Sequence, residues 1–489
     1  MQKSKCRRSG GGSVRKRSRR GAVLVLFVVL LTVIVGLLGL VIDTGRMMAS
    51  HREAQNAADA AALAGAYDLM RGKTAGQAET SAVAFVQTYN GMSTAAGPFL
   101  HIPPTTGTYA GSANAVEAIV NYPMNTLFVH VLGGSQSQMI QARAVARFEN
   151  VAAGEGAIVL DPSAIPGIAV GGNGTLKVIG DVIVNSAGGG VDENNVPVNN
   201  GNNGVAADGG TSSNSTNGIY ATNIMVVGGV NNPALFKNID PANPASPLHA
   251  KELPGPDPLA FLTTPTVGNG VINTTYGKVS VGNNNNVTLN PGIYQQLKIT
   301  GGTAVLKPGI YVISASNTNG LQITGGNVTA KGIMFYNTGS NYDPNSGAPD
   351  NTDSPDPLNL TPPPSASQQS GVQYGDVTIN AGMQFTPINT ADMTLNYTAA
   401  QRAALKPFDG MLFYQRRKNP VGASIEGNSS TGKLTGTIYA KWAKFKITGS
   451  GNYDAQYVVG SIALTGGGIV TLNYNGTNVA KAPQVFLVY

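Results

Sequence analysis

The sequence predicts a mainly β protein that is held at a membrane by one N-terminal helix. Three observations lead to this fold class. An uncharged apolar run lies near the N-terminus, the 489 residues include 63 glycines with only 12% charged residues, and short motifs recur in the second half. A low-charge, glycine-rich composition suits a turn-dense β protein and not a helical one. We expect a transmembrane helix, a small α+β membrane-proximal unit and a right-handed parallel β-solenoid (β-helix-like), with a β-sandwich as the alternative.

The apolar run extends over 21 residues, from Ala22 to Ile42, and includes Leu31, Gly36 and Gly39. As a helix with a rise of about 1.5 Å per residue, it would span roughly 30 Å, the thickness of a bilayer's hydrocarbon core. A cleaved signal peptide usually has a shorter apolar region followed by a small-residue cleavage site, which is not evident here. The sequence therefore predicts an uncleaved anchor over 21–43, with these five residues in it; a removed signal peptide is the alternative.

The net charge of +7 is concentrated at one end of the chain. Residues 1–20 hold nine of the 32 Lys and Arg and no acidic residue, so 23 basic residues face 25 acidic ones over 21–489. Basic residues flanking a membrane helix stay on the cytoplasmic side. We expect 1–20 to be a cytoplasmic tail in a single-pass inner-membrane protein whose bulk is periplasmic or extracellular, and no nucleic-acid partner. The single cysteine, Cys6, lies in that tail, so no disulfide is predicted beyond the anchor.

The segment 46–69 favours a helix and carries small residues four apart. Ala57, Ala61 and Gly65 form such a ridge, with Asn56 beside it. Small-residue ridges allow another helix to approach closely, so these four are predicted helix-packing residues. The alternative is that alanine is simply the best helix former. A second helix is expected over 75–89 and strands over 115–121 and 139–148, which makes 44–150 an α+β unit.

From residue 151 the chain repeats short motifs. The sequence LNPGIY at 289–294 returns as LKPGIY at 306–311, and KITGG at 298–302 returns as QITGG at 322–326 and KITGS at 446–450. Near copies of a short strand and a turn are typical of coils that stack on one another. We expect Asn283 to Asn286 at a turn, and an interior lined by aliphatic side chains such as Ile299, Ile323, Ile447 and Leu464. The predicted Gly/Asn-rich β-solenoid domain covers 151–489, with loop insertions near 187–217, 231–265 and 341–370.

Candidate catalytic residues are scattered through this region. Glycoside hydrolysis needs two positioned carboxylates, but Asp376, Asp409, Glu426 and Asp454 are scattered and unpaired in the sequence. Asp376 and Asp409 each stand beside a glycine, which is typical of a turn residue. Four histidines lie too far apart for metal-ligand spacing. The sequence thus predicts no catalytic, cofactor or metal site. Basic residues form one run at 416–418. Around Trp442, we expect Lys441 and Lys444 to face water and the aromatic ring to face the core, although a polymer contact is an open alternative.

The N-terminal motifs point to a family. The sequences RRGA at 19–22, VIDTGR at 41–46 and QNAADAAALAGA at 55–66 resemble the N-terminal region of TadG-like proteins of the Flp (tight-adherence, Tad) pilus-assembly system. Residues 115–149 resemble the rest of the TadE/TadG-like membrane-proximal region, and the distal half is similar to the glycine-rich repeat domains of some TadG-like proteins. This resemblance implies a non-enzymatic envelope accessory protein with Tad/Flp assembly partners. A surface adhesin or polysaccharide-active β-helix enzyme is the alternative, and an envelope polymer is a candidate ligand.

Two family features are missing from this sequence. Many TadG-like proteins carry a von Willebrand factor A domain with an Asp-x-Ser-x-Ser metal motif, but the nearest string here is DPSAI at 161–165. Prepilin-like relatives are cleaved after a glycine that is followed by Glu at the fifth position, whereas the fifth residue after Gly21 is Leu26. The resemblance therefore implies neither that metal site nor that processing.

Overall fold

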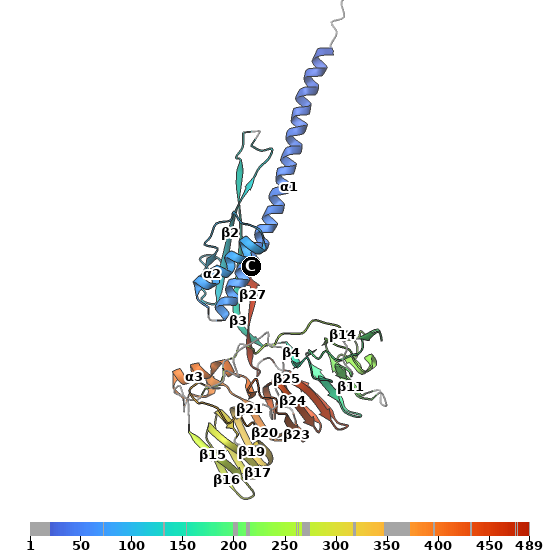
Figure 1. Cartoon of the computed structure of the whole chain (residues 1–489), viewed down its shortest axis with the longest axis vertical. Helices are drawn as coiled ribbons and strands as arrows, with labels where there is room; N and C mark the ends of the chain where they lie inside the picture. The colour runs from blue at the N-terminus through green and yellow to red at the C-terminus, as the bar shows by residue number, and fades with distance from the viewer. Residues whose placement is uncertain are drawn as a thin grey trace, which may run out of the picture. The chain divides into compact units, whose positions relative to one another are not determined.

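The chain forms two compact units in the computed structural model (Figure 1). One comprises Met1–Glu149 with Gln484–Tyr489, and the other is Asn150–Pro483. The second unit is thus inserted between two strands of the first. The structure describes residues 20–71, 73–130, 133–152, 154–198, 204–211, 216–260, 262, 264–266, 274–315, 319–346, 372–394, 397–430, 433–474, 476 and 478–488. The predicted basic tail therefore lies outside the described residues, apart from Arg20.

The first unit packs two α-helices and a π-helical turn on a four-stranded sheet. The helices are α1 (Arg20–Met70), α2 (Ala75–Val83) and the π-helical turn η1 (Ala84–Tyr89). The sheet has the order β1-β2-β3-β27, from β1 (Leu100–His101), β2 (Ala115–Asn125), β3 (Ser137–Ala152) and β27 (Lys481–Val488). Strands β2 and β3 form a hairpin in which Ala115 pairs with Arg147 and Asn125 with Ser137. The alternation expected over 139–148 is present, because Ile140, Ala142, Ala144 and Ala146 are buried.

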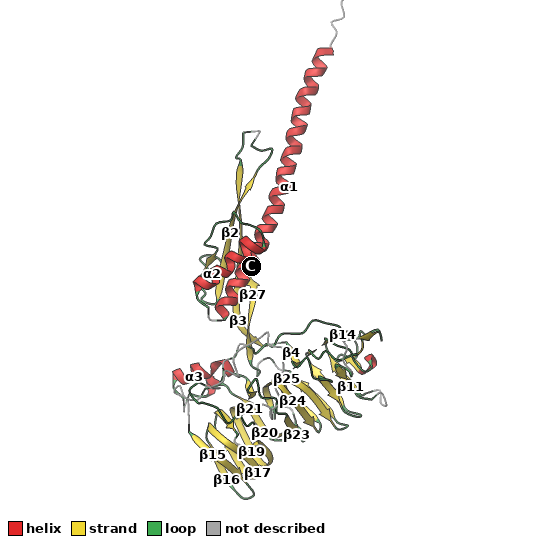
Figure 2. Cartoon of the chain, viewed as in Figure 1, coloured by secondary structure: helices red, strands yellow, loops and turns green. Residues whose placement is uncertain are grey.

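The second unit is built almost wholly of strands (Figure 2). Its first part contains β4 (Glu155–Val159), β5 (Ile168–Val170), β6 (Thr175–Ile179), β7 (Asp181–Val184), β8 (Gly190–Val191), β9 (Pro197–Val198), β10 (Ala207–Asp208), β11 (Gly218–Ala221), β12 (Ile224–Val226), η2 (Pro233–Leu235), β13 (Phe236–Asn238) and β14 (Leu248–Ala250). Its second part contains β15 (Thr275–Val281), β16 (Asn286–Leu289), β17 (Gly292–Leu306), β18 (Gly309–Ser314), β19 (Asn319–Thr338), β20 (Asp376–Asn380), β21 (Gln384–Pro387), η4 (Thr390–Asp392), α3 (Ala399–Leu405), η5 (Lys406–Phe408), β22 (Met411–Gln415), β23 (Ala423–Glu426), β24 (Thr435–Thr448), β25 (Gly451–Thr465) and β26 (Ile469–Asn473). The prediction of a mainly β protein with an N-terminal helix is confirmed.

Three parallel ladders run through this unit. The first passes through β18, β19, β22, β24, β25, β4, β7, β12 and β14. The second passes through β15, β17, β19, β20, β23, β24, β25, β5 and β10. The third joins β16, β17, β19 and β21, and also β25, β26, β6, β11 and β13. Long strands such as β19 and β24 contribute to more than one ladder, so β19, β20, β23, β24 and β22 close into a ring of pairings.

The recurring motifs lie on neighbouring strands in matching register. Lys298 pairs with Gln322 and Ile299 with Ile323, which aligns KITGG with QITGG. In the LNPGIY and LKPGIY copies, the tyrosine rings stack with centroids 5.8 Å apart. Each tyrosine hydroxyl donates to the carbonyl of the residue before the proline, at 2.5 Å for Tyr294 and 2.9 Å for Tyr311. Each copy of the motif thus forms the same turn between strands, and the tyrosine of that copy closes the turn by a hydrogen bond to its backbone.

A row of aliphatic side chains at paired strand positions lines the interior of the unit. The four side chains predicted to line it are all buried, with exposures of 1% or less. Paired positions continue the row from strand to strand through Val281, Ile299, Ile323, Ile379, Ile425, Ile447, Leu464 and Val170. The asparagine turn is also present, since Asn284 has a φ of 65°, a left-handed conformation that asparagine tolerates.

From β18 to β4 the first ladder is buried on both faces, which explains its continuous apolar strands. One face belongs to the interior. The other packs against the segment around 257–262, the helical region 388–411 and residues 480–482, in a cluster that includes Val312, Tyr336 and Tyr439. Strand β22, of sequence MLFYQ, is accordingly buried at every position.

Three sequence expectations differ from the structure in this unit. The segment 231–265, expected as a loop, contains β13 and β14, which pair in parallel with β11 and β12. The segment 187–217 includes the short strands β8, β9 and β10. Most of the third expected insertion, 341–370, lies outside the described residues. Lys441, expected to face water, is 5% exposed; Lys444 is exposed and Trp442 is buried, as expected. A register shift in β24 between Ala440 and Lys444 breaks the simple alternation.

Candidate functional site

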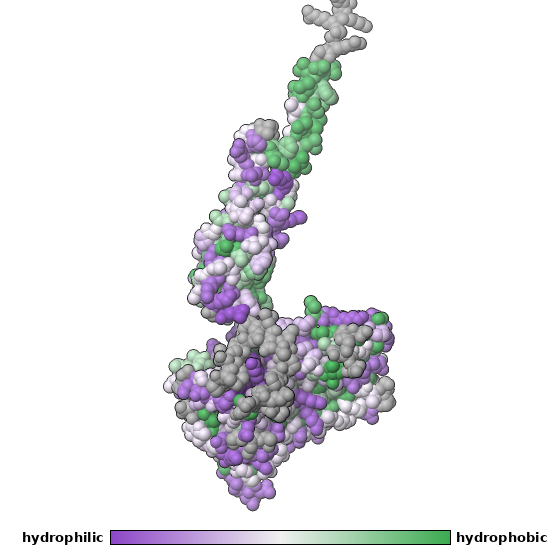
Figure 3. All heavy atoms as spheres, viewed as in Figure 1, coloured by the Kyte–Doolittle hydropathy of each residue, from purple (hydrophilic) through white to green (hydrophobic). Residues whose placement is uncertain are grey.

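The N-terminal half of α1 presents an apolar surface on the face seen in Figure 3. Its large apolar side chains from Val23 to Ile42 are 45 to 68% exposed, including Leu31 at 49% and Ile42 at 47%. Among the described residues, this helix is the one long and apolar enough to cross a membrane. Gly36 is partly buried and Gly39 is buried, while the side chain of Ala22 lies outside the described set. A helix that is apolar all round fits a lipid environment better than water.

Asp43 ends this apolar surface and is held by the hairpin of β2 and β3. Its side chain is 4% exposed, and its two carboxylate oxygens accept the backbone N–H groups of Leu127 at 3.0 Å, Phe128 at 2.8 Å and Val129 at 2.8 Å. Three donors compensate a buried carboxylate well. The contact joins residues 84 to 86 positions apart and holds the hairpin turn against the helix.

Gly39 lies one helical turn before Asp43 and meets the same hairpin. A Cβ atom at Gly39 would lie 2.6 Å from Cβ and 2.7 Å from Cγ of Phe128. Such distances are far below van der Waals contact, so any larger residue would displace the phenyl ring. Gly39 is predicted as an anchor residue from the apolar run. In the structure it also provides the space into which Phe128 packs.

The predicted helix-packing ridge faces the interior of its own unit. Ala57 and Ala61 are fully buried, and a Cβ at Gly65 would lie 2.6 Å from Cδ1 of Leu100. The cluster around them includes Ala78 and Ala82 of α2 and buried residues of β2. Asn56, by contrast, is exposed. The structure thus brings the small residues of the ridge together with α2 and the sheet, and leaves Asn56 on the surface.

Glu117 of β2 is a buried carboxylate that sequence reasoning did not single out. It is 0% exposed and accepts hydrogen bonds from Thr105 N–H at 2.9 Å, Thr106 Oγ1 at 3.0 Å and Arg143 Nε at 2.5 Å. Burial alone would raise the pKa of Glu117, but these hydrogen bonds outweigh burial and lower the pKa from 4.5 to about 2. All its partners belong to the first unit, so its role is to tie the 105–106 segment to the sheet.

The candidate acids of the second unit remain apart. Asp409 uses both carboxylate oxygens on Thr390, at 2.7 Å to the N–H and 2.9 Å to Oγ1. Asp454 accepts a hydrogen bond from Asn473 at 3.0 Å, and Asp376 and Glu426 are exposed at strand ends. Among the described residues, no group of three or more His, Cys, Asp or Glu could hold a metal ion.

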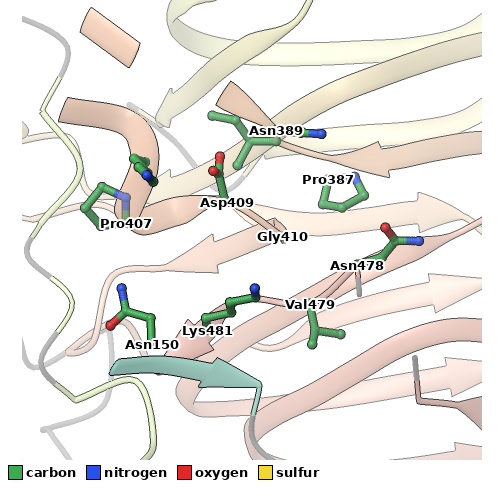
Figure 4. Close-up of a pocket in the computed structure, with 11 residues that line it drawn as sticks. Asn150, Pro387, Asn389, Pro407, Asp409, Gly410, Asn478, Val479 and Lys481 are labelled. Carbon is green, nitrogen blue, oxygen red and sulfur yellow. The ribbon is translucent and has the colours of Figure 1, made fainter. Parts of the chain in front are cut away.

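A polar pocket of about 370 Å³ lies beside Asp409 (Figure 4). Its described lining comprises Asn150, Pro387, Ile388, Asn389, Lys406, Pro407, Asp409, Gly410, Asn478, Val479 and Lys481. Asp409 is the one acid among these residues, and its oxygens are already taken up by Thr390. This lining does not supply the pair of carboxylates that glycoside hydrolysis requires.

Within the basic run at 416–418, the buried Arg417 has a structural role. Arg417, 3% exposed, donates from Nη2 to the carbonyls of Leu259 at 2.9 Å and Leu262 at 2.8 Å, and from Nε to the Tyr439 hydroxyl at 3.1 Å. Tyr439 in turn donates to Asp257 at 2.8 Å. Burial raises the pKa of Tyr439 well above its usual value, with Asp257 adding to the effect. The network fastens the 257–262 segment over the first ladder.

Comparison with known proteins gives one match. Residues 21–68 match the family model described as putative Flp pilus-assembly TadE/G-like. The matched range coincides with α1 and contains Gly39, Asp43 and the buried alanine ridge. No curated protein and no solved structure matches the chain. The resemblance drawn from the N-terminal motifs is confirmed over these residues.

Proposed function

We propose that this chain, whose N-terminal region is TadE/G-like, is a non-enzymatic membrane-anchored accessory protein of Flp/Tad-type pilus assembly or secretion. The observation that carries the proposal is the coincidence of the family match at 21–68 with a helix whose apolar half is exposed. The nine basic residues before Gly21 favour a cytoplasmic N-terminus, so the bulk of the chain is periplasmic or extracellular. The inner membrane and Tad/Flp assembly proteins are its proposed partners.

We infer further that the second unit is a right-handed parallel β-solenoid that serves as a spacer or binding surface. The three parallel ladders, the in-register motif copies and the buried aliphatic row support this. A sandwich made of hairpins would pair neighbouring strands antiparallel. Stacked strands leave backbone edges only at the ends of the stack, which gives length without disulfides. The polar pocket near Asp409 is where we propose that a contact with an envelope polymer be sought.

Two substitutions at one exposed position test the anchor. Leu31 lies midway along the apolar run and is 49% exposed, outside the buried core of its unit. An arginine at the centre of a membrane helix costs about 2.5–3.5 kcal/mol on insertion scales. We expect Leu31→Arg to reduce the membrane-bound fraction after cell fractionation and Leu31→Phe to leave it unchanged. An unchanged distribution for Leu31→Arg would contradict the anchor.

Topology and role need separate measurements. Protease added to spheroplasts should digest the chain beyond Asp43 and spare the basic tail, whereas protection of the C-terminal half would contradict the proposed orientation. Deletion of the gene should lower the number of Flp-like pili or the adherence of cells. An unchanged pilus count, or turnover of glycans by the purified chain, would favour the adhesin or polysaccharide-active alternative.

A further inference from the structure

We propose that the tip of the β2–β3 hairpin, at Leu127 and Phe128, is a second membrane contact that enters the lipid beside α1. The inference rests on the proposed anchoring of α1. It concerns an interaction surface whose partner is the hydrocarbon edge of the bilayer, and it assigns a role to a turn that lies outside the matched range of 21–68.

The depth of the tip is set by Asp43. The carboxylate closes the apolar run, and its three hydrogen bonds from Leu127, Phe128 and Val129 leave the turn little freedom to move along the helix. Releasing the turn would leave a carboxylate without donors at the border of an apolar layer, which is unfavourable. The turn is therefore held where the anchor ends.

Phe128 reaches beyond that border. Its ring lies against Gly39, four residues before Asp43, which on a helix is roughly 6 Å further into the apolar run. The side chains of α1 on this stretch are apolar and exposed, with Leu38 at 58% and Val41 at 68%. The phenyl ring and these side chains therefore lie at the same level along the helix axis.

The charged residues Glu117, Arg143 and Arg147 lie away from the turn, and in its described part the exposed apolar surface is confined to Leu127 and Phe128, because His130 and residues 135–138 are exposed and polar. From Tyr122 to Val129 the sequence YPMNTLFV has no charged residue. Leu127 is 50% exposed and Phe128 is 37% exposed. Apolar side chains clustered beside an apolar helix mark a lipid-facing surface.

Tryptophan emission in vesicles of brominated phosphatidylcholine tests the depth of the tip. The full chain is reconstituted with Phe128→Trp, and the wild type gives the background of Trp442. Tyr89→Trp, at a residue of the same unit that is 73% exposed, is the matched control, and Phe27→Trp, 62% exposed on α1, reports on the anchor. We expect emission at positions 128 and 27 to fall when the upper acyl chains carry bromine, and emission at 89 to stay constant.

The outcomes separate the tip from the anchor. Quenching at 27 with none at 128 would overturn the tip contact and leave the anchor standing, whereas no quenching at either would remove both. Protection of position 128 that grows with the protein-to-lipid ratio would mean contact with a second copy, which also overturns the proposal. Asp43→Ala should reduce the quenching at 128 and leave that at 27 unchanged, because the acceptor that holds the turn is gone.

Discussion

Replacing Ile447 by alanine tests whether the aliphatic row is a continuous core. Ile447 is fully buried in β24, and its paired neighbours Ile425 and Leu464 are each 1% exposed. The substitution removes three carbon atoms, which at about 0.8 kcal/mol each amounts to about 2.5 kcal/mol of lost burial. Both neighbours are fixed by backbone pairing and cannot close the gap, so a cavity term brings the loss to about 3–5 kcal/mol.

The same strand carries the reporter and the control. Trp442, the single tryptophan, is 7% exposed in β24, so its emission follows unfolding of this region in urea, with the full chain kept in a mild detergent. Lys446 is exposed next to Ile447, and Lys446→Ala should change the free energy of unfolding by no more than about 0.5 kcal/mol. Equal losses for the two variants would refute the argument, because Ile447 would then not contribute to a shared core.

Three further predictions concern single contacts. The folded-state pKa of Glu117 is depressed to about 2, so its stabilisation is present above pH 4.5 and lost as pH falls toward 2; calorimetry should show this loss, up to about 3 kcal/mol, flattened in Glu117→Gln. Gly65→Ala should lower the melting temperature, because the new Cβ would lie 2.6 Å from Leu100. Gly76→Ala in α2, with open space around it, should raise the free energy of unfolding by about 0.4–1 kcal/mol. A melting temperature for Gly65→Ala at or above that of Gly76→Ala would contradict the packing. Tyr311→Phe removes a hydroxyl whose single hydrogen lies between two carbonyl oxygens, each 2.9 Å away, and should cost about 0.5–1.5 kcal/mol in urea titrations. An unchanged midpoint would show that this hydrogen bond does not stabilise the turn.

What the sequence predicted well depends on local pattern. The N-terminal apolar helix follows from the length of one apolar run. The stacked turns follow from two copies of a six-residue motif that differ only at the second position, in which Tyr294 and Tyr311 hold equivalent places. Even the burial of Ile299 and Ile323 could be inferred, because both occupy the same position in repeated motifs.

What it missed depends on contacts between distant parts of the chain. The Asp43 contact joins residues more than 80 positions apart, so no local sequence pattern predicts it. Lys441 lies near Asp257, 3.8 Å from one of its oxygens, because a register shift in β24 interrupts the alternation that predicted a solvent-facing lysine. Strands β13 and β14 have three residues each, too few for a period of two to stand out among the prolines and asparagines around them.

The order of strands within the three ladders does not follow the order of the chain, and this bears on how the protein folds. Strands β4, β5 and β6 pair on one side with β25 and β26, so Gln456 donates to the Glu155 carbonyl across 301 positions. Contacts of such sequence separation slow folding. As the chain is synthesised from its N-terminus, the edges of β4 to β6 stay unpaired until the final strands follow, and unpaired edges recruit other strands. A truncation before β25 would therefore convert the first strands of this unit into an aggregation template, and the same truncation would deprive the first unit of β27.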